Sequence, residues 1–281
     1  VTETITSTFV SSVGSFVDDF EVKVASYTGA GGAVATVNGT AALHASLHLA
    51  GVKHGDLVLT QALTFVATCN ALLQLGADPV FIDVSRESLG LDPLALEHFL
   101  ETEVTINDNG ECIHGSSGRR VQAVVPMHTF GHPVDLDELV RVCAAWNLTI
   151  VEDAAESLGS FYKGAHTGTV GEYGTLSFNG NKTITTGGGG MILCRNAETT
   201  IKAKHVTTTA KQPHKYEYFH DQAAFNYRLP NLNAALGCAQ MEILEKLLAD
   251  KRKIAEGYRR FFLSSNLEFI VEPEYAHSNY W

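Results

Sequence analysis

The segment "SFNGNKTITTGGGG", from Ser177 to Gly190, places a single lysine among small polar residues and follows it with four glycines. A lysine amine that is buried or lies near another cation loses proton affinity and can become a Schiff-base nucleophile. The glycine run fits a hairpin turn, or a backbone that makes room for a bulky ligand. Most lysines are solvated, so this segment alone leaves open whether Lys182 is catalytic.

Two other segments contain groups that could bind the charged parts of a ligand. "NGTAAL" (38–43) starts a predicted helix directly after a predicted strand, where free N–H groups and the Thr40 hydroxyl could hold an anion. "VEDAAES" places Asp153 and Glu156 just past another predicted strand. Such carboxylates can bind a metal ion, a ribose hydroxyl or a protonated heterocycle, or can simply cap the next helix. The absence of a GKS/T sequence disfavours a nucleoside-triphosphate P-loop.

Several histidine, asparagine and tyrosine residues elsewhere have equally open interpretations. His128, in "MHTFGHPVD", belongs either to a substrate pocket or to a plain turn. "FNYRLPN" supplies Asn226 and Tyr227 to a possible anion clamp, or is a loop before a helix. His44 and His48 are four residues apart without an acidic third ligand, which favours a half-buried helix face over zinc. We therefore expect no metal site.

The elements that must position these residues alternate between strands and helices. Strands are predicted at 33–37, 56–61, 79–84, 121–127 and 148–153, and helices at 39–51, 65–77 and 135–147. The last helix has an apolar face of Leu136, Leu139, Val140 and Cys143. This alternation predicts an α/β fold with a mostly parallel sheet covered by helices on both faces. Ligands of such folds bind at the carboxyl ends of the strands, where the candidate residues fall.

The C-terminal part has a different pattern. Residues 231–262 are predicted to form one long helix with Asn231 as N-cap, and 267–273 to form the first strand of a further unit. We expect a large ligand-binding domain over 1–245 and an incomplete small domain over 246–281. The chain lacks an initiator methionine and stops abruptly after this strand, so we expect it to be a fragment.

Composition limits the class of protein. The chain is 45% hydrophobic with a net charge of −11, which indicates a globular protein and argues against a nucleic-acid-binding surface. No apolar run approaches the roughly 18 residues of a membrane span. Five scattered cysteines without metal-ligand spacing are typical of reduced thiols in the cytoplasm.

Together these motifs resemble the DegT/DnrJ/EryC1/StrS sugar aminotransferases, which have the aspartate-aminotransferase fold (fold type I) and use pyridoxal phosphate. The resemblance runs from about Phe9 to the last residue. It rests on "NGTAAL", "TFVAT", "VEDAAES", "SFNGNK", "TTGGGGM" and "NYRLPNLNAALG" in this order.

The resemblance implies a role for each candidate residue. Lys182 would bind the cofactor covalently, Asp153 would pair with its pyridine nitrogen, and Glu156 would lie beside its ring hydroxyl. Phe65 would stack on the ring, and Asn226 would reach the phosphate of the other subunit in a homodimer. The remaining implied contacts are to the cofactor at its phosphate end (Gly39, Thr40, Ala41, Ser177) and to the substrate (His128, Asn179, Tyr227).

A lysine rather than a histidine at position 182 implies transamination rather than dehydration. The implied partners are L-glutamate and the C4 ketone of a nucleotide-linked 4-keto-6-deoxy sugar, for polysaccharide or glycan biosynthesis. The segment 207–237 resembles the branch of the family that acts on UDP-4-keto-6-deoxy-N-acetylglucosamine. Position 188 agrees, because it is glycine here and usually Glu in perosamine-type relatives. The alternatives are a GDP-perosamine-type synthase and a non-catalytic regulatory subunit that binds pyridoxal phosphate. A dinucleotide-dependent oxidoreductase is disfavoured because no G-x-G-x-x-G opens a helix.

Overall fold

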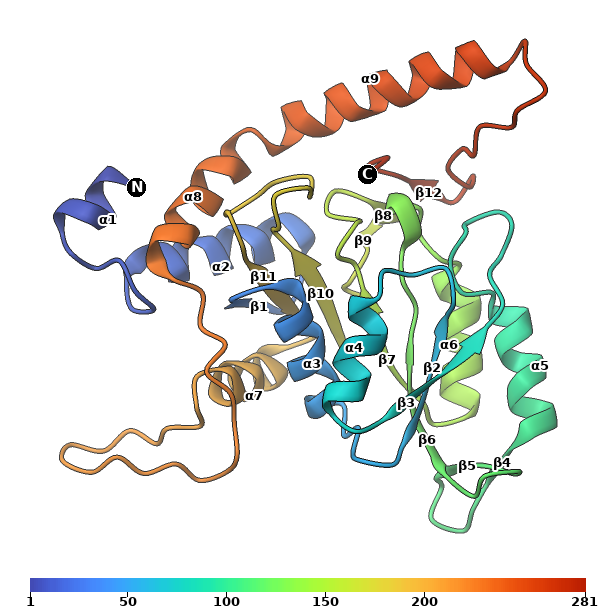
Figure 1. Ribbon diagram of the computed structural model, residues 1–281, viewed down its shortest axis with the longest axis horizontal. Coiled ribbons are helices and arrows are strands. Elements are labelled where there is room, and N and C mark those ends of the chain that lie inside the picture. The colour runs from blue at the N-terminus through green and yellow to red at the C-terminus, as the bar shows by residue number, and fades with distance from the viewer.

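A computed structural model describes residues 1–281, and its centre is a mixed sheet (Figure 1). The main path of the sheet has the strand order β1-β11-β10-β7-β6-β2-β3. The bounds are β1 Gly32–Thr36, β2 Leu57–Gln61, β3 Asp78–Ile82, β6 Arg120–Val125, β7 Thr149–Asp153, β10 Tyr173–Ser177 and β11 Gly190–Cys194. β4 (Val104–Ile106) and β5 (Cys112–His114) extend it beside β6.

Strands β3, β2, β6, β7 and β10 are parallel neighbours, which confirms the predicted mostly parallel sheet. β11 is the exception, because it pairs antiparallel with both β10 and β1. The segment between β10 and β11 contains Lys182 and the glycines, and it returns the chain directly to the neighbouring strand. The sequence from Ser177 to Gly190 is therefore the turn of a long hairpin.

Helices cover both faces of the sheet, as predicted. One face packs against α3 (Gly39–Leu49), α4 (Ala67–Gln74) and α7 (Ala197–Thr207). The other packs against α2 (Ser15–Thr28) and α8 (Asn231–Glu242) at one end, and α5 (Pro93–Glu103) and α6 (Leu136–Ala145) at the other. Side chains of strand β2 alternate between the hydrophobic cores on the two faces of the sheet. Val58 faces α3, whereas Leu57 and Leu59 face α5 and α6.

The predicted apolar face of the helix at 135–147 was wrong at one position. Val140 is exposed, whereas Val142 is fully buried with Leu136, Leu139 and Cys143. The helix packs against α5 as well as the sheet, and its buried stripe is therefore shifted toward Val142.

The single long helix predicted for 231–262 is two helices. α8 ends at Glu242 and α9 (Leu244–Phe262) begins after Ile243, whose φ of −111° and ψ of 3° interrupt the helical path. Asn231 is not the N-cap but the first helical residue. Its buried amide donates instead to the carbonyl of Phe9 at 2.7 Å, which ties α8 to the N-terminal segment.

The segment 267–273 does not form the predicted strand. Its Glu272 pairs with Arg252 of α9 at 2.7 Å, so the segment is held by side chains rather than by a strand partner. The strand of this region is β12 (Ala276–His277), which joins β8 (Phe161–Tyr162) and β9 (Ala165–His166) in a small separate sheet. The remaining short helices are α1 (Thr2–Thr6) and the 3-10 turn η1 (Thr129–Gly131). No helix is both long and apolar enough to cross a membrane.

Candidate active site

The candidate residues meet around one cavity of about 270 Å³ at the carboxyl ends of β7 and β10 and the start of α3. The sequence-predicted residues that line it are Gly39, Thr40, Phe65, Asp153, Glu156, Ser177, Asn179 and Lys182. They come from four separate segments, so the cavity is a product of the tertiary fold. Gly188 and Gly189 of the glycine run complete the wall beside Lys182.

The Lys182 side chain points into this cavity and is only 11% exposed, although its loop lies on the surface. Its Nζ lies 3.9 Å from Oε1 of Glu156. Burial lowers the pKa of the Lys182 amine, and the nearby carboxylates of Glu156 and Asp153 oppose that shift. The amine thus has the buried setting that favours a nucleophile over a permanently charged surface group.

Asp153 and Glu156 face the cavity from the end of β7 and the turn that follows it. Asp153 accepts hydrogen bonds from the Thr68 hydroxyl at 2.7 Å and from the Ala155 N–H at 3.2 Å. Burial raises the pKa of Glu156, while the Phe130 N–H (2.9 Å) and the Lys182 ammonium lower it. Since its two donors are the Thr68 hydroxyl and the Ala155 amide, the nearly buried Asp153 carboxylate keeps free lone pairs for a cationic group.

The start of α3 forms the opposite wall. Asn38 has extended backbone angles and caps the helix, its Oδ1 accepting the Ala41 N–H at 2.7 Å. The first N–H groups of a helix have no partner within it, so those of Gly39 and Thr40 are available to an anion. Ala41 is different from its neighbours because its N–H is taken by Asn38, and its side chain does not line the cavity.

The glycines of the run differ in their surroundings, since Gly190 is closely packed and Gly188 faces open space. A Cβ on Gly190 would lie 2.3 Å from the Asn38 carbonyl oxygen, so this glycine lets β11 approach the capping turn of α3. A Cβ on Gly188 would meet nothing within 4 Å. The hairpin interpretation of the run is thus confirmed by the antiparallel pairing of β10 and β11, and room for a ligand beside Gly188 stays a prediction.

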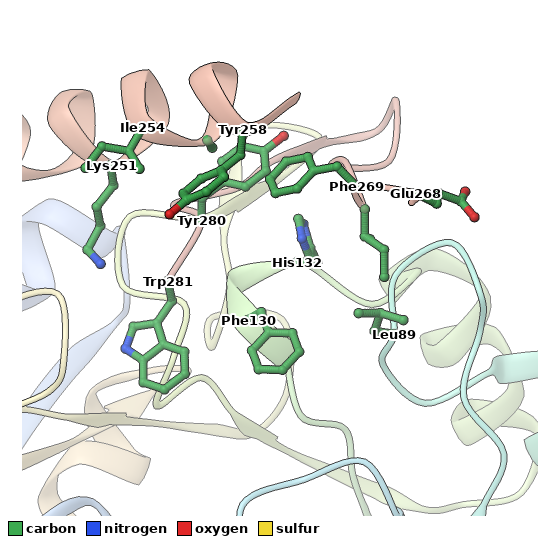
Figure 2. Close-up of a pocket in the computed structure, with 12 residues that line it drawn as sticks. Leu89, Phe130, His132, Lys251, Ile254, Tyr258, Glu268, Phe269, Tyr280 and Trp281 are labelled. Atoms are coloured by element: carbon green, nitrogen blue, oxygen red, sulfur yellow. The ribbon is translucent and has the colours of Figure 1, made fainter. Parts of the chain in front are cut away.

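Trp281, which no sequence motif indicated, covers the Lys182 amine. Its ring centroid lies 4.5 Å from Nζ, and its ring stacks parallel to that of Phe130 at 6.5 Å. Figure 2 shows both rings below helix α9, where they border a second, mostly apolar cavity of about 460 Å³. Trp281 is held in place by its backbone N–H, which donates to the Asn279 side-chain oxygen and to the Phe130 carbonyl.

Besides Ala41, three predicted site residues lie outside the cavity. His128 is fully buried, with Nε2 2.9 Å from Glu152 and Nδ1 accepting the Val134 N–H, so it has no ring nitrogen left for a substrate. Tyr227 turns its hydroxyl toward His44 at 3.2 Å. Asn226 belongs to the extended segment between α7 and α8, and its Oδ1 accepts from Arg228 at 2.8 Å. The structure of one chain brings none of them to its own cavity.

The donor set fits pyridoxal phosphate. An anion-binding helix start, an uncompensated carboxylate and a buried primary amine surround one space, and Phe65 lies exposed at its edge. These groups correspond to the phosphate, the protonated ring nitrogen and the aldehyde of that cofactor. Fold and site together therefore define a pyridoxal-phosphate-dependent protein of the aminotransferase fold.

Comparison with known proteins gives the family. The chain belongs to the DegT/DnrJ/EryC1/StrS aminotransferase family, whose family model matches residues 1–281. This confirms the resemblance, the fold type and the cofactor, because the family is one of aminotransferases that depend on pyridoxal phosphate and includes sugar aminotransferases.

Individual relatives cover the whole chain. It is 38% identical to a putative pyridoxal phosphate-dependent aminotransferase, EpsN of Bacillus subtilis (strain 168), over 100% of this chain and 70% of that protein. It is 34% identical to a GDP-perosamine synthase of Escherichia coli O157:H7, over 100% of this chain and 72% of that one. A crystal structure of a family member from Brucella abortus matches 99% of this chain and 71% of its own, with a TM-score of 0.87 and 25% identity.

Proposed function

We propose that this chain carries the active site of a transaminase that moves an amino group from L-glutamate to the C4 ketone of a nucleotide-linked 4-keto-6-deoxy sugar. The observation that supports this most is the grouping of Lys182, Asp153 and Glu156 around one cavity beside the start of α3. The proposed acceptor is UDP-4-keto-6-deoxy-N-acetylglucosamine, and the proposed product is an amino sugar for a surface polysaccharide or glycan.

The walls of the cavity would hold the cofactor by its ends. The N–H groups of Gly39 and Thr40 and the Ser177 hydroxyl would bind the phosphate. Asp153 would pair with the ring nitrogen, and Glu156 would lie beside the ring hydroxyl. Pyridoxal phosphate, when bound, supplies an aldehyde and a ring that withdraws electrons from the substrate carbon.

Lys182 would carry out the chemistry at its Nζ. Burial favours the neutral amine, which can attack a carbonyl carbon and later accept and return a proton at the substrate carbon. The Glu156 carboxylate 3.9 Å away would stabilise the amine whenever it holds the extra proton. The Trp281 ring over Nζ would exclude water from the amine during these transfers.

The partner subunit would complete the site. Asn226 lies outside its own chain's cavity and would reach the cofactor phosphate of the other subunit in a homodimer. Asn179 lines the cavity and would contact the substrate. His128 and Tyr227 are not part of this proposal, because their polar atoms are engaged elsewhere.

A GDP-perosamine-type synthase is the second candidate, favoured by relatives of that name at 34% and 35% identity. In the test, the purified protein is incubated with pyridoxal phosphate, L-glutamate and either the UDP-linked or the GDP-linked 4-keto-6-deoxy sugar. The amino sugar product is detected by mass spectrometry. Amination of the UDP sugar supports the first proposal, and amination of the GDP sugar alone supports the second. Amination of neither would contradict both.

A further inference from the structure

The carboxylate of Asp153 is oriented by a residue that the proposed mechanism does not use. Thr68, in the first turn of α4, is fully buried, and its hydroxyl lies 2.7 Å from Asp153 Oδ2. An ionised carboxylate only accepts hydrogen bonds, so Thr68 is the donor in this contact. The Ala155 N–H at 3.2 Å holds the other oxygen, and both oxygens are thus fixed by one donor each.

The direction of this hydrogen bond determines the role of Thr68 in a second one, with the hydroxyl of Thr64. Thr64 Oγ1 lies 2.9 Å from Thr68 Oγ1, and either atom could donate by geometry alone. Because Thr68 gives its only proton to Asp153, it can act only as an acceptor toward Thr64. The other group within 3 Å of the Thr64 hydroxyl is the Met127 Sδ at 2.9 Å, a weaker acceptor than a hydroxyl oxygen. The two hydroxyls then form a directed chain, from Thr64 through Thr68 to Asp153, in which each bond polarises the next.

This chain of hydroxyls, the threonine relay, connects two walls of the cavity that are distant in sequence. Thr64 and Thr68 flank Phe65, and the Thr68 N–H donates to the Phe65 carbonyl at 3.2 Å. Thr68 is therefore bonded both to the carboxylate and to the backbone of the exposed aromatic residue at the edge of the cavity. A single buried residue therefore links the two, through its side chain to Asp153 and through its backbone to Phe65.

We propose that Thr68 is a positioning residue for Asp153, and that Thr64 completes its hydrogen bonding. The proposal rests on the proposed function, in which Asp153 pairs with the cofactor's ring nitrogen. A donated hydrogen bond stabilises the charged carboxylate and limits its rotation. Without it the carboxylate would be less well oriented toward a ring cation, and the cofactor would bind more weakly.

The chain offers a matched control for a test of this proposal. Thr60 on β2 is also fully buried, and its hydroxyl donates to the Val125 carbonyl at 2.8 Å, away from the cavity. Thr68→Val and Thr60→Val each remove one buried hydroxyl from the same type of residue. Thr68→Ser keeps the hydroxyl and removes a methyl group.

The measurements are the Kd of the apoprotein for pyridoxal phosphate and the pH dependence of the bound cofactor's absorption band. We expect Thr68→Val to weaken binding about tenfold, the scale of one lost hydrogen bond to a charged group, and to shift the midpoint of the pH dependence. Thr68→Ser should restore both values, and Thr60→Val should leave both unchanged. Unfolding curves of all variants correct for lost stability.

Thr68→Val with the wild-type Kd and midpoint would overturn the proposal, as would identical changes in Thr60→Val. Asp153→Asn separates this failure from failure of the proposed function. If Asp153→Asn alters binding and the midpoint while Thr68→Val does not, only the relay is wrong. If Asp153→Asn also leaves the Kd and the midpoint unchanged, the role assigned to Asp153 is wrong, and the role proposed for Thr68 is wrong with it.

Discussion

Two opposing effects act on the Lys182 amine, and they can be separated by substitution. Burial lowers the pKa of the lysine, whereas the Glu156 carboxylate, 3.9 Å from Nζ, raises it. Removing the negative charge of Glu156 therefore lowers the pKa of Lys182 further. The neutral, nucleophilic form should then be reached at lower pH.

Glu156→Gln should lower the pH midpoint for attachment of pyridoxal phosphate to Lys182 by about one pH unit, the lower end of the effect of a nearby opposite charge. The rate of attachment, followed by the absorption of the lysine-bound cofactor, gives the midpoint. Glutamine can still accept the Phe130 N–H, so the turn should persist. Glu198→Gln, an exposed carboxylate paired with Lys202, is the control. An unchanged or higher midpoint in Glu156→Gln would contradict this account.

At the scale of elements, the approach of β11 to the capping turn of α3 depends on one glycine. Gly190→Ala would place a Cβ 2.3 Å from the Asn38 carbonyl oxygen, so β11 or the turn must move. We expect a loss of unfolding free energy of about 2 kcal/mol, typical of overpacking, measured by denaturant titration. Gly188→Ala, where a Cβ meets nothing within 4 Å, should change stability by less than about 0.5 kcal/mol. Equal losses in the two variants would show that the close approach is not what Gly190 provides.

Elements also explain what the sequence could and could not predict. Gly39 and Asp153 are recognisable because one follows and the other ends a predicted strand, and strand ends of a parallel sheet meet at one edge. Lys182 is recognisable by its setting among small polar residues and glycines. His128 follows a strand as well, but it turns away from the cavity to Glu152, the neighbour of Asp153 on β7 that faces the opposite side of the sheet. Strand position alone does not tell these two directions apart.

Contacts between distant segments were beyond prediction for a similar reason. Trp281 reaches Lys182 because Asn279 is buried against the carbonyls of Glu156 and Leu158, each 2.9 Å from its Nδ2. No local pattern signals that contact. Thr68 was within a recognised motif, "TFVAT", but its partner Asp153 is 85 residues away. The break at Ile243 was missed because the apolar pattern of 231–262 continues across it.

At the scale of the whole molecule, the proposed homodimer requires that each site draw residues from two chains. Lys182 and Asp153 line the cavity of their own chain, whereas Asn226 does not. A hybrid of one Lys182→Ala subunit and one Asn226→Ala subunit would then contain one intact site and one doubly altered site.

Hybrid dimers, purified with two different affinity tags, should recover about half of the wild-type activity, since one site of the C2 pair is intact. Each parent homodimer should be strongly impaired. A hybrid of Lys182→Ala with Asp153→Ala provides the control and should stay inactive, because both residues belong to the same chain's cavity. Failure of the first hybrid to exceed its parents would contradict the shared site.

The central claim is that Lys182 is the amine that binds pyridoxal phosphate and that the bound cofactor accepts an amino group. The most direct measurement is the absorption spectrum of the purified protein with pyridoxal phosphate, before and after L-glutamate, for the wild type and Lys182→Ala. We predict a band of the lysine-bound cofactor in the wild type that fades on addition of L-glutamate and is absent from Lys182→Ala. The same band in both proteins, or no band in either, would contradict the account.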